Sequence, residues 1–181
     1  EDFVLLRSDG TPQYNFASVI DDHCMEISHV IRGEGHISNT YRQLLVYEAL
    51  QLSPPKFAHL STILGSDGKI LSKRHGAKSI NALQSEGYLP EAILNYLSLL
   101  GWSPPKDGNE ILKTRHLTEQ FTLKRVHRNP AIFDEGKLNW VNRNHLKKCE
   151  DSDLVDLFLP FLAAQGWVPD APDVATRAWL E

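Results

Sequence analysis

One feature constrains the fold of this chain most: a strand-like segment at residues 27–33, followed by a short polar loop and then by residues with helical spacing up to Leu50. The segment contains Ile27, Val30 and Ile31 and predicts a β-strand, and Ser38 or Asn39 is a suitable N-cap for the helix. In open α/β sheets, ligands lie where such a strand ends in a polar loop before a helix. That loop therefore supplies three candidate ligand contacts, Arg32, Glu34 and His36.

Turn signals separate further elements on both sides of this unit. Asp9, Gly10, Thr11 and Pro12 form a turn signal, and residues 14–20 after it are predicted as a short strand or a buried run. Pro54 and Pro55 separate the helix from a second predicted strand at residues 58–64.

Beyond residue 78 the pattern becomes helical. A short helix is predicted at residues 79–86 with Gly87 as its stop, and a longer one at 91–100, opened by Pro90 and ended by Gly101. Three interruptions are predicted farther on: breaks at Asn129-Pro130 and at Gly136, and a kink or interruption at Pro160 in a helix after residue 152.

Composition limits the classes of protein to which the chain can belong. Its 181 residues allow one or two domains, and a hydrophobic content of 41% is ordinary for a globular chain. No stretch approaches the roughly 20 apolar residues of a membrane helix, and no signal segment opens the sequence. Cys24 and Cys149 lie far apart, which argues against a disulfide framework or a zinc site and favours a cytoplasmic location.

The net charge of −4 hides a strong asymmetry. Residues 113–148 carry nine Lys and Arg against three Asp and Glu, whereas residues 149–181 carry one against seven. A basic field of this kind can hold a phosphate backbone. From charge alone, a solvated helix face is the better explanation.

A basic loop carries the strongest functional signal: Gly68-Lys69-Ile70-Leu71-Ser72-Lys73-Arg74-His75-Gly76-Ala77. Lys73 and Arg74, with a hydroxyl and two glycines in the same loop, can close on a triphosphate and neutralise the charge that builds on phosphoryl oxygens. The alternative is a solvated basic turn.

The loop resembles the Lys-Met-Ser-Lys-Ser signature of class I aminoacyl-tRNA synthetases, in the form carried by bacterial glutamyl-tRNA synthetases. Other segments resemble that family in its order and spacing: residues 14–18, 21–23, 30–36, 87–92, 95–97 and 100–102. The resemblance runs from about Phe3 to about Leu146. No His-Ile-Gly-His-type motif of the family occurs, so the chain is expected to be a fragment.

The resemblance implies a fold and a domain division. Residues 1–64 would be the C-terminal half of an α/β, Rossmann-type nucleotide-binding domain. Residues 65–149 would form the signature loop and a mostly α-helical tRNA stem-contact domain, and residues 150–181 the truncated beginning of an α-helical anticodon-binding domain.

The resemblance also implies the substrate contacts. Arg32 would bind the side-chain carboxylate of glutamate, because a guanidinium can donate two parallel hydrogen bonds and stays charged. The rest of the glutamate pocket would come from Tyr14, Asn15, Phe16, Ala17, Ser18 and His36, with Phe16 and Ala17 nearer the core.

ATP would be bound by the signature segment and by the loop after the first strand. The implied residues are Gly35, Ile70, Leu71, Ser72, Lys73 and Arg74, of which Lys73, Ser72 and Arg74 would be catalytic. Gly35 and Ile70 depart from the family, which usually has an acidic residue and a lysine there. Glu34 and Lys69 are the neighbours that could take over these contacts.

The implied contacts to the inner corner of tRNA lie in the basic segment: Lys124, Arg125, Arg128, Arg143, Lys147 and Lys148, with His127 and His145 beside them. Such phosphate contacts position a nucleic acid without reading its sequence. Trp140 is predicted to be a core residue rather than a platform for a base.

The activity implied is that of a glutamyl-tRNA synthetase, with L-glutamate, ATP with Mg²⁺, and tRNA(Glu) as its reactants. The isolated chain is expected to be inactive or very weak. No zinc or other metal site is predicted, and Asp21, Asp22 and His23 are read as adjacent strand residues that point to opposite faces.

Four alternatives stay open. A glutaminyl-tRNA synthetase has a related pocket and loop, and a glutamyl-queuosine tRNA(Asp) synthetase fits less well, because residues 80–148 resemble a stem-contact region that it lacks. Outside these enzymes, the chain could be a non-catalytic tRNA-binding module or a helical scaffold that binds a protein.

Overall fold

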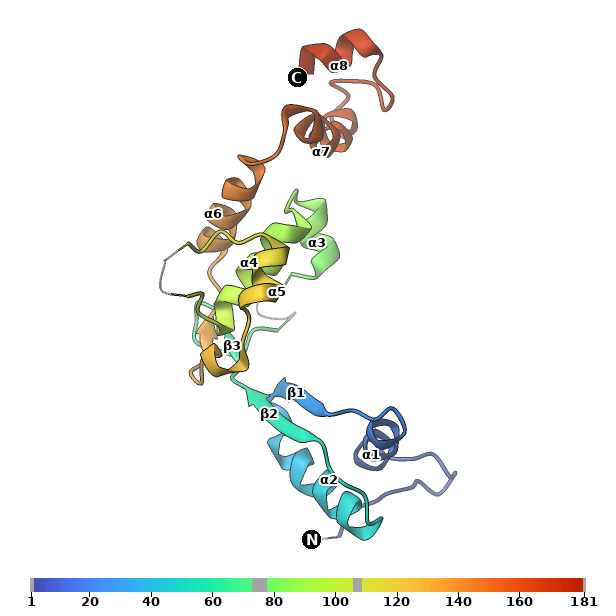
Figure 1. The fold of residues 1–181 in the computed structure, drawn as a ribbon. Helices are drawn as coiled ribbons and strands as arrows, with labels where there is room; N and C mark the ends of the chain where they lie inside the picture. Colours follow the sequence, from blue (N-terminus) through green and yellow to red (C-terminus); the bar gives the residue numbers. More distant parts are fainter. Residues whose placement is uncertain (1, 73–77, 106–108, 181) are drawn as a thin grey trace. The chain divides into compact units, whose positions relative to one another are not determined.

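The structure is a computed structural model that describes residues 2–72, 78–105 and 109–180. The chain divides into two units (Figure 1). The first consists of residues Glu1–Thr62 and His127–Pro130, and the second of Ile63–Val126 and Ala131–Glu181.

The first unit is built on a parallel strand pair. Strand β1 (His29–Gly33) pairs with β2 (Lys56–Leu60) in a register that sets His29 opposite Lys56 and Gly33 opposite Leu60. Parallel strands need a long crossover, and here it contains a 3-10 helix, η1 (Glu34–His36), and helix α2 (Ile37–Ala49). Figure 1 shows β1 and β2 side by side, with α2 running along them. The predicted strand, polar loop and helix are therefore confirmed.

The predicted N-cap of that helix is wrong. Ser38 and Asn39 lie in the first turn of α2, which follows η1 directly and has His36 at its N-cap without a capping side-chain hydrogen bond.

Helix α1 (Tyr14–Cys24) packs on α2 and corrects the prediction of a strand or buried run at residues 14–20. Phe16, Val19 and Ile20 follow the three- and four-residue spacing of one helix face. Val19 forms a buried core with Val46 and Tyr47, against which Phe16 packs. This tertiary contact decides the helix over the strand propensity of the same side chains.

The second unit is mostly helical, with one small parallel pair of strands, β3 (Ile63–Leu64) and β4 (Ala131–Ile132). The strand predicted at residues 58–64 is thus two strands, because β2 and β3 belong to different sheets. The helices are α3 (Ile80–Ser85), α4 (Pro90–Gly101), α5 (Thr114–Gln120), η3 (Leu123–Arg125), α6 (Glu135–Leu146), α7 (Asp151–Ala164) and α8 (Val174–Leu180).

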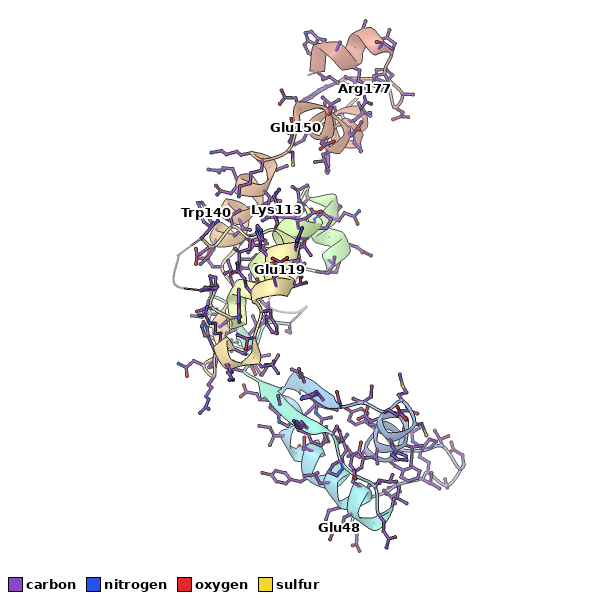
Figure 2. The ribbon with its side chains drawn as sticks, in the orientation of Figure 1. Glu48, Lys113, Glu119, Trp140, Glu150 and Arg177 are labelled. Atoms are coloured by element: carbon purple, nitrogen blue, oxygen red, sulfur yellow. The ribbon has the colours of Figure 1, made fainter. Side chains whose placement is uncertain are left out.

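The core of the second unit lies where α4 packs on α6. Its buried members are Leu83, Tyr88, Leu89, Ala92, Ile93, Tyr96, Leu100, Ile111, Leu138 and Val141. A smaller cluster joins Trp102, Leu112 and Leu117, with Val126 packed against it. Arg177 on α8, labelled in Figure 2, forms an ion pair with Asp156 on α7.

Local signals set several helix ends as predicted. The Ser79 hydroxyl accepts a hydrogen bond from the Ala82 amide at 3.1 Å and caps α3. Gly87 takes φ +87° after that helix, a conformation that favours glycine, and Pro90 opens α4.

Two predicted interruptions are wrong. Asp134 Oδ1 accepts a hydrogen bond from the Lys137 amide at 3.0 Å and caps α6, so Gly136 lies inside the first helical turn rather than at a break. Helix α7 continues past Pro160 to Ala164, so an interruption there is wrong, whereas the alternative of a kink stays a prediction. In the described part of the chain, no helix combines the length and apolarity needed to span a membrane.

Candidate active site

Arg32 is the centre of the candidate site. It is half-buried near the end of β1, and its Nη2 donates hydrogen bonds to Thr40 Oγ1 at 2.6 Å and to Gln43 Oε1 at 2.7 Å. Both acceptors come from α2 and are buried. The strand–loop–helix unit therefore fixes the guanidinium at the carboxyl end of the strand.

Three predicted pocket residues lie around this guanidinium. Arg32 Nη1 is 3.4 Å from the Tyr14 hydroxyl, and that hydroxyl is 3.4 Å from Nδ1 of His36. Asn15 Oδ1 accepts a hydrogen bond from Gln43 Nε2 at 3.3 Å. Helix α1, strand β1 and η1 thus bring Tyr14, Asn15, Arg32 and His36 together.

Arg32 forms no ion pair among the described residues, where no carboxylate lies within 4 Å of it, and its charge acts on the Asp22 carboxyl only at longer range. Its Nε is buried without a hydrogen-bond partner in this part of the chain, and its guanidinium lies 5.4 Å from the centre of the Phe57 ring. A half-buried cation held only by neutral groups is suited to an anionic ligand.

Three residues of this site are missing from the sequence-based prediction: Thr40, Gln43 and His59. His59 Nε2 lies 2.9 Å from Thr40 Oγ1. Burial lowers the pKa of His59, and the nearby charges of Arg32 and His36 lower it further. A sequence signal that could have identified Thr40 and Gln43 is their spacing from His36, because residues four and three apart share one face of a helix.

The other predicted glutamate contacts have structural roles here. Phe16 packs against the core of the first unit. The Ser18 hydroxyl donates a hydrogen bond to the Tyr14 carbonyl at 2.8 Å within α1, and Ala17 is half-buried in the same helix.

The loop after β1 holds Glu34 in a hydrogen-bonded position. Its Oε1 accepts from the Thr62 amide at 3.0 Å and from the Thr62 hydroxyl at 2.6 Å. These hydrogen bonds, the hydroxyl first, lower the pKa of the Glu34 carboxyl. Gly35 beside it is exposed, and a Cβ added there would meet no atom within 4 Å.

The predicted signature segment begins in a tight hairpin. Leu64 bridges Ile70 in antiparallel fashion, the Leu71 amide donates to the Ile63 carbonyl at 2.9 Å, and Gly68 in the turn has φ +74°. Ile70 is exposed, Leu71 and Ser72 are half-buried, and Lys69 lies 4.0 Å from Asp67 in an exposed ion pair. Lys73 and Arg74 lie outside the described residues.

Lys78 is the first described residue after that segment, and it bridges two helices. Its Nζ lies 2.7 Å from Glu86 Oε2, after α3, and 2.7 Å from Glu135 Oε1, at the start of α6. These two hydrogen bonds, that of Glu135 first, raise the pKa of Lys78. The signature segment is therefore followed by a lysine, Lys78, that two ion pairs hold in place.

The predicted tRNA contacts lie on several elements. Lys124 and Arg125 belong to η3, Arg143 is exposed on α6, and Lys147 and Lys148 are exposed directly after α6. Arg128 belongs to the segment His127–Pro130 of the first unit.

Two aromatic side chains of α6 differ from their predictions. His145 is buried and its Nε2 bonds Asn95, so its ring is not part of the exposed basic surface. Trp140 is 43% exposed and is therefore not a core residue (Figure 2). Because Trp140 and Arg143 are three residues apart, they share one exposed face of α6, and Lys147 follows four residues later as the C-cap of the helix.

The acidic pair before β1 also differs from its prediction. Asp21, Asp22 and His23 lie in the last turns of α1, not on a strand. Burial raises the pKa of Asp22, against the opposing effect of Arg32. Among the described residues, no three His, Cys, Asp or Glu side chains are grouped so as to hold a metal ion.

Comparison with known proteins gives consistent matches. The family model of class I tRNA synthetases (E and Q), catalytic domain, matches residues 1–140. A glutamate–tRNA ligase from Desulforamulus reducens is 49% identical over 99% of this chain, and one from Heliobacterium modesticaldum is 55% identical over 96%. The chain spans 37% and 35% of these two relatives.

A solved structure matches as well. The crystal structure of a glutamate tRNA ligase from Elizabethkingia meningosepticum, in complex with its amino acid, has a TM-score of 0.82 and 35% identity, covering 98% of this chain and 38% of that one. By this family match over most of its length, the chain belongs to the class I tRNA synthetases (E and Q), of whose catalytic domain it carries a part.

Proposed function

We propose that this chain supplies the glutamate pocket and the signature segment of a glutamate–tRNA ligase. In the first step, an α-carboxylate oxygen of L-glutamate attacks the α-phosphorus of ATP and pyrophosphate leaves, which gives glutamyl-adenylate. In the second step, a hydroxyl of the terminal ribose of tRNA(Glu) attacks the glutamyl carbonyl and AMP leaves.

The observation that carries this proposal is the state of Arg32. Its guanidinium is positioned by Thr40 and Gln43 and has no carboxylate within 4 Å among the described residues. The side-chain carboxylate of glutamate supplies the missing negative charge. Tyr14 and His36 lie beside the guanidinium and would form the wall of the pocket.

Glutamine is the less suitable substrate for this arrangement. Its neutral amide would leave the Arg32 guanidinium without a directly paired anion in a half-buried site, which is costly. The names of the curated relatives point the same way.

For ATP, we propose that the signature segment contacts the phosphates, as the resemblance to the family implies. Lys73 would neutralise the charge that develops on the phosphates as pyrophosphate leaves, with Ser72 and Arg74 assisting. Mg²⁺ would accompany ATP as its usual counterion. Glu34 is occupied by Thr62 in this structure, so a contact to ATP through Glu34 would need the carboxylate oxygen that Thr62 leaves available.

For tRNA, we propose that its phosphates are contacted by exposed cations of the second unit, Lys124, Arg125, Arg143, Lys147 and Lys148, and by Arg128 of the first unit. The division into a catalytic part at 1–64, a stem-contact part at 65–149 and the start of an anticodon-binding part at 150–181 belongs to this proposal. Because tRNA charging serves translation, we place the protein in the cytoplasm.

Substitution of Arg32 in the complete polypeptide that contains this chain tests the proposal. Arg32→Gln should raise the KM for glutamate roughly tenfold to a hundredfold, the range expected for a lost hydrogen bond to a charged group, with the KM for ATP unchanged. Arg32→Lys keeps the charge and should lie in between. An unchanged KM for glutamate in Arg32→Gln would remove the proposal's main support.

The chain by itself provides a second test. We expect it to bind tRNA(Glu) in a salt-sensitive manner and to charge it only weakly or not at all until the remainder of the polypeptide is supplied. Binding that never leads to charging, even with that remainder present, would favour a non-catalytic tRNA-binding module.

A further inference from the structure

The two groups that hold Arg32 are both electrically neutral. Nη2 of a guanidinium carries two hydrogens, and here one goes to the Thr40 hydroxyl at 2.6 Å and the other to the Gln43 amide oxygen at 2.7 Å. Gln43 is 2% exposed, so water does not compete for this bond. A carboxylate at position 40 or 43 would bind the Arg32 guanidinium more strongly, yet neither residue carries one.

We propose that Thr40 and Gln43 are positioning residues for recognition of the substrate carboxylate. They fix the guanidinium without neutralising it, so that its charge stays available to the ligand. This inference rests on the proposed function, because it takes a carboxylate as the ligand of Arg32.

The arrangement also predicts the side from which the carboxylate binds. With both Nη2 hydrogens in use, the remaining donors are the two on Nη1 and the one on Nε. Nη1 has only the long 3.4 Å contact with the Tyr14 hydroxyl. The substrate carboxylate therefore meets Arg32 at Nη1, next to Tyr14.

Both acceptors are themselves held in place by other elements. Gln43 Nε2 donates to Asn15 Oδ1 at 3.3 Å, which ties α2 to α1. Thr40 Oγ1 lies 2.9 Å from His59 Nε2 on β2 and 3.1 Å from the His36 carbonyl. Because each acceptor has a second partner, the orientation of Arg32 is set before a ligand arrives.

Gln43→Glu is the sharpest test of this idea. The substitution keeps the shape of the side chain but puts a carboxylate where the Arg32 Nη2 bond now lies, and Asn15 can turn its amide so that it donates to the new group. Arg32 would then be neutralised from within. We expect the KM for glutamate to rise roughly tenfold to a hundredfold, as for a lost bond to a charged group.

Three readouts separate this effect from damage to the fold. In Gln43→Glu the KM for ATP and the melting temperature should stay as in the unchanged protein, and the preference for glutamate over glutamine should shrink. The matched control is Gln51→Glu, which adds the same charge at an exposed position just after α2. It should leave all these values unchanged.

Thr40 supplies a second test that adds no charge. Thr40→Ser keeps the hydroxyl and should retain the KM for glutamate, whereas Thr40→Val removes the acceptor and should raise that KM. This pair decides the question if Gln43→Glu does not fold.

The outcomes distinguish the inference from the function on which it rests. A raised KM in Arg32→Gln together with an unchanged KM in Gln43→Glu, or in Thr40→Val, overturns the positioning role and leaves the proposed function standing. An unchanged KM in Arg32→Gln overturns both.

Discussion

His145 Nε2 donates a hydrogen bond to Asn95 Oδ1 at 2.9 Å, between two buried side chains of α6 and α4. The Leu112 amide donates to the same oxygen at 2.9 Å, and Asn95 Nδ2 donates to the Glu110 carbonyl at 2.9 Å. Because Leu112 can only donate, the Asn95 oxygen must accept, and His145 therefore carries a proton on Nε2.

Asn95→Ala should destabilise the second unit strongly. The substitution leaves the Leu112 amide, the Glu110 carbonyl and His145 Nε2 without their partner in a site where Asn95 is fully buried. We expect the free energy of unfolding to fall by about 3 kcal/mol. Asn144→Ala, which removes one bond to the Trp140 carbonyl from a half-buried side chain, is the control and should cost less than about 1 kcal/mol. Equal losses in urea titrations would contradict the role of the network.

Stability should fall on acidification below about pH 6.5, the ordinary pKa of histidine. Burial lowers the pKa of His145 in the folded protein, Lys148 lowers it further and Glu91 opposes this. The unfolded chain therefore binds the proton more tightly, so stability is complete above the unfolded pKa and is lost as the pH falls toward the folded one.

His145→Gln isolates this contribution, because its amide can donate the same hydrogen bond without titrating. Urea titrations between pH 5 and pH 7.5 should show a smaller slope for this variant. The dependence of stability on pH that remains in this variant would include the contribution of His59, whose pKa is also lowered. An unchanged slope would remove His145 from the explanation.

Gly87→Ala should cost about 1 kcal/mol through the backbone alone. Gly87 has φ +87°, while an added Cβ would meet only Phe161 at an ordinary 3.7 Å. Gly101, the last residue of α4, has open space around it and no positive φ, so Gly101→Ala should be neutral or slightly stabilising. Thermal unfolding of both variants compares them directly.

Lys78→Met should lower the melting temperature more than Arg115→Met. Removal of Lys78 leaves the carboxylates of Glu86 and Glu135 near each other without their shared cation, whereas Arg115 has a single exposed partner, Glu119. The additional change Glu86→Gln should recover part of the loss. If the double variant melts at a lower temperature than Lys78→Met alone, the shared-cation explanation is refuted.

Neutralising the exposed cations at the end of α6 should weaken the salt dependence of tRNA binding. Each phosphate contact removed, by Arg143→Gln or Lys147→Gln, should reduce the slope of log K against log salt by about 1. Lys113→Gln, at an exposed position before α5, is the control (Figure 2). An equal reduction in all three variants would indicate a general charge effect rather than a contact surface.

The predictable part of the site is the part that the local sequence encodes. Arg32 lies near the end of a recognisable strand and His36 follows it, so their approach to each other could be expected. Thr40 and Gln43 lie inside a helix, where polar residues usually indicate a solvated face. Their burial depends on a cation from another element, which local patterns do not contain.

Long-range contacts explain the remaining errors. Residues 14–20 contain side chains typical of strands, and only the packing of Val19 on α2 makes this segment a helix. His145 stands in a basic stretch and reads as a surface residue, but its partner Asn95 is 50 residues away.

The Ser61 hydroxyl donates a hydrogen bond to the Asn129 carbonyl at 2.8 Å, although the residues on both sides of His127–Pro130 belong to the second unit. This detour has a consequence for the order of events during translation. A ribosome makes residues 1–62 before residues 127–130. The hydrogen bond from Ser61 to Asn129 can therefore form only after α3, α4 and α5 have been made. Synthesis of the first unit is therefore completed only when residues 127–130 have been made. A stop in synthesis after Thr62 would release the first unit without the segment His127–Pro130.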